Sequence, residues 1–226
     1  GDPARWLYDT SPAPCTRLNA LQQCTGGPVA DTATAAVLGA LAAPEVAKRS
    51  QRQGVTVVNV GNSHVAAFLV FKGRILGVYE HHTGMLDTDA LLFDLKEFGF
   101  GWLPDEQVRA KGGHGCAFLA PLPPEAEGFA PTFAVGPRRE MLLGHAQFIA
   151  PHGDMMIAGC HGLLHGSEAG WHLPPGHGGG QQGHAGRQGK GCGSSPAISG
   201  QPTQWRPAQA SHQNGTHELR QAARAV

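Results

Sequence analysis

The stretch that decides the fold is VTVVNVGNSHVAAFLVFKGRILGVYEHHTG, from Val55 to Gly84. It holds three apolar runs, separated first by a polar turn and then by a short Lys-Gly-Arg hairpin turn; the runs are Val55–Val60, Val65–Phe71 and Ile75–Tyr79. Apolar, β-branched runs of this length, bounded by Gly and Asn, predict strands. We therefore expect a buried three-stranded meander with these residues in its core: Val57, Val60, Phe68, Val70 and Ile75.

The polar turn of this stretch is a candidate ligand site, and its four residues are Gly61, Asn62, Ser63 and His64. Gly61 can adopt a backbone conformation that other residues avoid, and it leaves room for a ligand. Backbone N–H groups in such a turn can face phosphate oxygens. The alternative interpretation is a hairpin connection with no binding role.

Charge and cysteine usage exclude several classes of protein. The 226 residues include 17 Lys or Arg and 17 Asp or Glu, so the formal net charge gives no electrostatic argument for binding nucleic acid or an acidic membrane. No apolar run reaches the roughly 18 residues of a membrane helix, and no apolar signal segment is visible. The five cysteines lack CxxC spacing, and we therefore expect a cytoplasmic protein with reduced thiols.

The composition changes near Gly166, after which Gly, Gln, His, Pro, Ala and Ser dominate. Such a segment cannot bury enough apolar surface to offset the entropy of ordering it. We therefore expect an α/β domain over residues 1–165 and a low-complexity, disordered tail over residues 166–226.

Helices and further strands are expected around the meander. An Ala-rich stretch capped by Asp31 or Thr32 should form a buried helix that stops at Pro44, and 45–54 should be a polar connector. The other expected elements are helices at 16–23, 86–98, 104–109 and 140–147, strands at 132–135 and 155–158, and glycine turns at 111–115 and 159–162. This order predicts an α/β fold with a mixed β-β-β-α-β-α-β sheet and helices on its faces, the order of one ribonuclease H-like, actin-like half.

Three motifs resemble those of sugar kinases, actins and heat-shock ATPases. The helix before their second phosphate loop is similar to residues 31–41, DTATAAVLGAL. The second phosphate loop itself is similar to residues 55–70, VTVVNVGNSHVAAFLV, and their adenosine motif is similar to residues 154–164, DMMIAGCHGLL. The resemblance implies ATP with Mg²⁺, with phosphates at the Gly61–His64 turn. It also implies an adenosine contact at Gly159, Cys160 and Gly162. Asp154 itself could be an acid that faces metal-bound phosphate, or a strand-entry residue that makes turn hydrogen bonds.

More closely, the chain resembles a prokaryotic family labelled pyruvate formate-lyase activating protein. The matching pieces run from Thr16 to Leu164: TRLNAL, VNVGNSH, GRILGVYEHHTG, GGHG, GPRR and APHGDMMIAGCHGLL. A radical-SAM activase needs three cysteines in a CxxxCxxC-type cluster, and no such spacing is present. The chain looks like the second half of a duplicated actin-like molecule, so an N-terminal half or a second copy is the expected partner that completes its cleft.

Histidines and acids supply a second candidate chemistry. Glu80, His81 and His82 are consecutive, and neighbouring side chains on an extended segment point to opposite faces. Turns at strand ends often converge on one edge of an α/β sheet, which would gather histidines from separate glycine turns. The candidate Zn, Mn or Fe ligands are His64, Glu80, His81 or His82, His114 and Asp154, with His152 in a further turn. The alternative is that these histidines hydrogen-bond the turns and hold their shape.

Two further features are open to more than one interpretation. Arg138 and Arg139 follow a Gly-Pro turn at an expected helix start, where they could bind phosphate or carboxylate or lie solvated on the surface. Cys160 could be a nucleophile, or a small buried side chain that fills space. The leading functional prediction is an ATP-binding domain, with Asp154 and His64 as catalytic candidates; the alternatives are a metal-dependent hydrolase and an inactive fragment.

Overall fold

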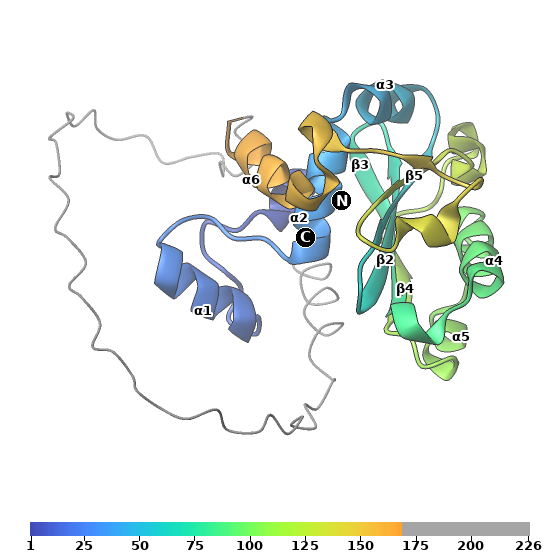
Figure 1. The fold of residues 1–226 in the computed structure, drawn as a ribbon, viewed down its shortest axis with the longest axis horizontal. Helices are drawn as coiled ribbons and strands as arrows, with labels where there is room; N and C mark the ends of the chain where they lie inside the picture. The colour runs from blue at the N-terminus through green and yellow to red at the C-terminus, as the bar shows by residue number, and fades with distance from the viewer. Residues whose placement is uncertain (169–226) are drawn as a thin grey trace, which may run out of the picture. The chain divides into compact units, whose positions relative to one another are not determined.

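The computed structural model describes residues 1–168, in which a mixed sheet is covered by helices (Figure 1). The strands are β1 (Val55–Val60), β2 (His64–Phe71), β3 (Arg74–His82), β4 (Gly115–Phe118), β5 (Thr132–Val135) and β6 (Gln147–Phe148). The α-helices are α1 (Thr16–Thr25), α2 (Thr32–Ala42), α3 (Pro44–Arg52), α4 (Thr88–Gly99), α5 (Asp105–Ala110) and α6 (Ala158–Glu168). Short 3₁₀ helices are η1 (Pro3–Trp6), η2 (Thr83–Met85), η3 (Pro124–Phe129), η4 (Arg139–Leu142), η5 (Pro151–Gly153) and η6 (Met155–Ile157).

The six strands lie in the order β4-β3-β2-β1-β5-β6. β1 to β4 pair antiparallel in succession, whereas β5 is parallel to β1 and β6 is parallel to β5. The α/β class and the mixed sheet are therefore confirmed. The predicted first strand has the observed bounds of β1, and the other two meander strands are each longer than predicted.

Each face of the sheet has its own apolar core. One core packs α2 and α3 against β1, β2, β3 and β5, and contains Val57, Phe68, Val70 and Ile75. The other packs α4 and α5 against the opposite face and contains Val60. Figure 1 shows the sheet between these two sets of helices. All five residues predicted for the meander core are fully buried.

A β-bulge in the β2–β3 hairpin determines which side chains face which core. The two-residue turn at Lys72 and Gly73, both with positive φ, joins strands that pair Val70 with Ile75 but Leu69 with Gly77. Leu76 is therefore the extra residue in β3. A one-residue shift moves every later side chain of a strand to the other face of the sheet.

Helices α2 and α6 make backbone contact at small residues. Asp31 caps α2 by accepting a hydrogen bond from the Ala33 N–H, as expected. A Cβ on Gly39 would lie 1.8 Å from the Ala158 carbonyl oxygen, and one on Gly162 would lie 2.2 Å from the Ala35 carbonyl oxygen. Only glycine allows this approach, so Gly162 has a packing role here.

Several sequence-based predictions are wrong. The segment expected to be a polar connector is α3, because Pro44 occupies its first turn and begins a helix. The segment expected to be a strand and glycine turn at 155–162 is η6 followed by α6. The expected helix at 140–147 is a single 3₁₀ turn, η4, with a loop that leads to β6, and β4 was not predicted at all.

The boundary expected at residue 165 lies within α6, which continues to Glu168. The predicted disordered tail otherwise lies outside the described residues. Among the helices of residues 1–168, none has the length and apolar character needed to cross a membrane.

Candidate metal centre

Three histidines from three separate segments meet at one edge of the sheet. His64 is the first residue of β2, His82 is the last residue of β3, and His114 ends the glycine loop before β4. His64 pairs directly with His82 in the β2–β3 ladder, and the His114 N–H donates to the Glu80 carbonyl oxygen at 3.0 Å. The antiparallel ladder and the start of β4 therefore place all three rings at the same corner of the sheet.

The three rings are close enough for one ion. Ring centroids lie 4.8 Å apart for His64 and His82, 5.1 Å for His64 and His114, and 4.4 Å for His82 and His114. One nitrogen from each ring can be chosen so that the three atoms lie within 4.8 Å of one another. His114 is buried and the other two are partly exposed, so the group opens to solvent on one side.

The His114 imidazole is held in the neutral form that binds metals. Burial lowers the pKa of His114 to about 4, with further lowering from the neighbouring His82, His64, His81 and Arg109. At neutral pH this ring is therefore uncharged, and one of its nitrogens is of the acceptor kind that ligates metals.

His81 and Glu80 were predicted as ligands but do not belong to this group. His81 is fully buried on the opposite face of the sheet, and its Nδ1 lies 3.2 Å from the His82 carbonyl oxygen. Its neighbour across the loop is Gly113, where a Cβ would lie 2.3 Å from the His81 Cδ2. Glu80 faces the same side as His82 because the two are two residues apart in β3.

Glu80 is the acidic group on this face of the strand. Its Oε2 is buried and has no hydrogen-bond partner among the described residues. Burial raises the pKa of Glu80 to about 7; the negative charge of Asp31 raises it further, and the positive charge of Arg17 opposes the shift. Arg17 is itself paired with Asp31 at 2.6 Å.

Asp154 and His152 do not reach the three histidines. Asp154 is exposed and accepts a hydrogen bond from the Met156 N–H. Neither residue belongs to the group whose ligand atoms lie within 4.8 Å of one another. His152 instead pairs with His161, with ring centroids 4.0 Å apart.

The Gly61–His64 turn is closed by its own hydrogen bonds. The Gly61 N–H donates to the His64 carbonyl oxygen at 2.9 Å, and the Thr83 hydroxyl donates to the Gly61 carbonyl oxygen at 2.8 Å. Gly61 does not have positive φ; a Cβ there would lie 2.8 Å from the His64 carbonyl oxygen. Glycine is thus needed for close approach within the turn, and Asn62 and Ser63 lie exposed at its tip.

The residues predicted to contact adenosine, and the two arginines predicted to bind phosphate or carboxylate, have other surroundings in the structure. Gly159 and Gly162 face α2, and Cys160 is exposed on α6, so the interpretation of Cys160 as a buried filler is wrong. Arg138 precedes η4, which is too short to serve as a helix N-terminus for anions. Arg139 stacks over the Phe148 ring at 5.5 Å.

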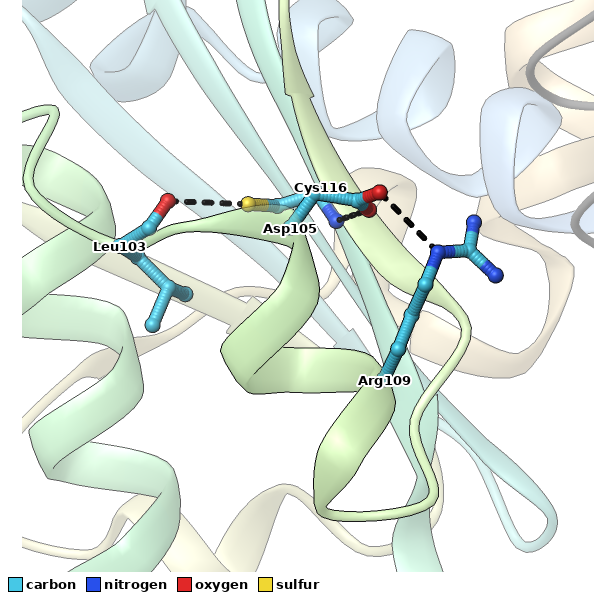
Figure 2. Close-up of polar contacts among 4 residues, drawn as sticks. All are labelled: Leu103, Asp105, Arg109 and Cys116. Carbon is cyan, nitrogen blue, oxygen red and sulfur yellow. Dashed lines mark hydrogen bonds and ion pairs between the residues drawn. The ribbon is translucent and has the colours of Figure 1, made fainter.

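Sequence reasoning missed the contacts that hold the loop of His114. The Asp105 side chain accepts hydrogen bonds from the Cys116 N–H at 3.0 Å and from Arg109 Nε at 3.0 Å, and the Cys116 thiol donates to the Leu103 carbonyl oxygen. Figure 2 shows how these contacts fix α5 to the start of β4. On the other side, the Lys111 ammonium binds the buried Asp94 carboxylate at 2.8 Å.

The described part of the chain is thus an α/β protein with three histidines gathered at one corner of a mixed sheet. Residues 1–141 match the family described as "Putative pyruvate format-lyase activating enzyme (DUF1786)". This match covers more than half of the 226 residues, so the chain belongs to that family, as its motifs predicted. No curated protein and no solved structure matches the chain.

Proposed function

We propose that this protein is a metal-dependent hydrolase whose divalent ion, Zn²⁺ in the first instance, is held by His64, His82 and His114. The single observation that carries the proposal is that nitrogens of the three rings lie within 4.8 Å of one another. Two of the rings are partly exposed to solvent, so an ion can reach the group from outside.

Three imidazoles suit Zn²⁺ and also other first-row metals. Catalytic zinc sites keep three protein ligands and leave the fourth position for water, whose pKa the ion lowers to about 7. The partly open side of the group provides such a position. Glu80, on the same face of β3 as His82, has a carboxylate oxygen with no hydrogen-bond partner within residues 1–168, and this oxygen could orient that water.

The activating-enzyme label of the family is not supported by the cysteines of this chain. A radical-SAM centre is held by three cysteine thiolates. Within residues 1–168 no three cysteines gather; Cys15 and Cys116 are buried at separate places, and Cys24 and Cys160 are exposed. We therefore derive no step from an iron–sulfur cluster.

The test is metal analysis of the full chain purified without chelators, followed by titration of the metal-free protein with Zn²⁺ and Co²⁺. We expect about one ion per chain in the wild type and in His145→Ala, which removes an exposed histidine outside the group. His82→Ala and His114→Ala should lose at least tenfold in affinity. Equal affinity in all four proteins would refute the site.

Hydrolysis is assayed separately with p-nitrophenyl acetate and bis(p-nitrophenyl) phosphate. Zn²⁺ should restore turnover to the metal-free wild type and not to His82→Ala, because the ion held by the three histidines would supply the activated water that attacks the ester. Tight binding without turnover on either ester would retain the metal centre and refute the hydrolase assignment.

The strand order favours a second candidate function, nucleotide binding. β1 to β3 are antiparallel and β5 and β6 run parallel to β1, an arrangement that supports a ribonuclease H-like, actin-like half. The turns after β1 and β5 adjoin, since the Arg138 N–H donates to the Val60 carbonyl oxygen at 3.0 Å. Ligands of α/β sheets commonly bind beyond such carboxyl ends.

Calorimetric titration with MgATP tests this second candidate. The matched pair of variants is Arg138→Met, beside the two turns, and Arg52→Met, which removes an exposed arginine at the end of α3. Phosphate binding at the turns predicts weaker binding in the first variant alone. No heat of binding in the wild type would remove ATP as a ligand of this chain.

A further inference from the structure

A three-residue network around one buried carboxylate lies beneath the loop that carries His114. Asp94, on α4, is fully buried, and its two carboxylate oxygens have separate partners. The Tyr79 hydroxyl donates to Oδ2 at 3.0 Å, and the Lys111 ammonium donates to Oδ1 at 2.8 Å. Exclusion of water strengthens the hydrogen bond between the buried Tyr79 and Asp94, whereas the Lys111 side chain is 40% exposed and its ion pair is partly screened by solvent.

Lys111 begins the loop and His114 ends it, so the network holds one end of a four-residue segment. Gly112 and Gly113 between them offer little resistance of their own to backbone motion. Gly113 lies against the buried His81 ring, and its N–H donates to the Val108 carbonyl oxygen at 2.9 Å. The loop is thus fixed at both ends and supported on one face by His81.

We propose that Asp94 is a positioning residue for the metal centre. By holding Lys111, Asp94 sets the position of the His114 ring relative to His64 and His82. This inference rests on the proposed metal centre. It adds that a residue of α4, on the opposite face of the sheet, fixes the position of the His114 ring in the metal-free protein.

The physical basis is the cost of ordering a ligand. A loop with two adjacent glycines has many conformations, and the His114 nitrogen can bind an ion shared with His64 and His82 in only a few of them. Groups that orient metal ligands from outside the coordination shell typically contribute 10–100-fold in metal affinity. A comparable loss is expected when the Lys111–Asp94 pair is broken.

The central experiment compares Lys111→Met with Lys96→Met in the full chain. Both variants remove one lysine, but Lys96 is exposed on α4 and has no ion-pair partner among the described residues. We expect Lys111→Met to bind Zn²⁺ and Co²⁺ about tenfold more weakly or worse and to shift the visible absorption bands of bound Co²⁺, which report the ligand geometry. Lys96→Met should match the wild type in both measurements.

Two further variants separate positioning from folding. Lys111→Arg keeps a cation for Asp94 and should retain most of the affinity. The double variant Asp94→Asn/Lys111→Met removes the uncompensated buried charge that could unfold Lys111→Met, and circular dichroism of the metal-free forms checks the fold. We expect the double variant to be folded and still to bind Co²⁺ weakly with the shifted bands.

The outcomes distinguish this inference from the metal centre itself. A wild type that binds no Zn²⁺ or Co²⁺ refutes the centre and this inference with it. A wild type that binds, together with a folded double variant of unchanged affinity and unchanged Co²⁺ bands, overturns the positioning role alone and leaves the three-histidine centre in place.

Discussion

His64 and His82 face each other across the β2–β3 ladder, with ring centroids 4.8 Å apart, while His81 beside them points into the core on the other face. Substitution of the two neighbouring histidines should therefore give opposite results. His82→Ala should lose metal and keep its fold. His81→Ala should lower the free energy of unfolding by about 2 kcal/mol, because it leaves a cavity, and keep near-normal metal stoichiometry.

Chemical denaturation of the metal-free proteins and elemental analysis of the purified ones measure both effects. Metal loss in His81→Ala with a normal melting transition would contradict the assignment of the two faces.

Gly61 should matter to the metal centre through His64. A Cβ at Gly61 would lie 2.8 Å from the His64 carbonyl oxygen, so Gly61→Ala must open the turn and displace the start of β2. We expect a several-fold weaker affinity for Zn²⁺, measured by competition with a chelating dye. Ser63→Ala, at the exposed tip of the same turn, is the control and should bind as tightly as the wild type.

Glu80 should make the metal-free protein less stable as the pH rises. Its pKa is raised from 4.5 to about 7 in the folded state, so the folded protein binds the proton more tightly than the unfolded chain. Stability from this group is therefore fully present below pH 4.5 and is lost between there and about pH 7, by up to about 3 kcal/mol.

Glu80→Gln should remove this part of the pH dependence, whereas Glu125→Gln, at an exposed carboxylate, should leave it in place. The measurement is urea unfolding between pH 4.5 and 8 in the presence of a chelator. An unchanged slope in Glu80→Gln would contradict the raised pKa.

The α2–α6 contact should tolerate no added methyl group. Gly39→Ala and Gly162→Ala each place a Cβ within 2.2 Å of a backbone carbonyl oxygen of the other helix. Because neither backbone can yield without separating the helices, each change should cost about 3 kcal/mol or more. Gly27→Ala, where the Cβ meets nothing within 4 Å, serves as the control. Thermal melts of the three variants provide the comparison.

The meander and the capped helix α2 could be predicted because their signals are local. β-branched runs and the Asp31 cap depend on neighbouring residues only, and the structure has that cap. The segment at 155–162 was misassigned because its apolar, glycine-containing sequence is compatible both with a strand and turn and with a helix. Its helical form depends on the contact of Gly162 with α2, which lies more than a hundred residues earlier in the sequence. A local sequence pattern carries no information about such a contact.

The candidate site was predicted only as a larger set of histidines and acids. A simple two-residue hairpin at Lys72 and Gly73 would pair His64 with His81. The bulge at Leu76 shifts the register by one residue, pairs His64 with His82 and sends His81 to the other core. Gly77, next to Leu76 inside the strand, is consistent with a bulge but does not fix the register, so the choice between two adjacent histidines required the structure.

The close contact between α2 and α6 has a consequence for the order in which the chain folds as it leaves the ribosome. The meander can pair as soon as its own residues emerge, since its partners are adjacent in sequence. The apolar side of α2 against which α6 packs has no cover until α6 is made, more than a hundred residues later. During synthesis this helix is the surface on which a chaperone would bind and from which aggregation would start.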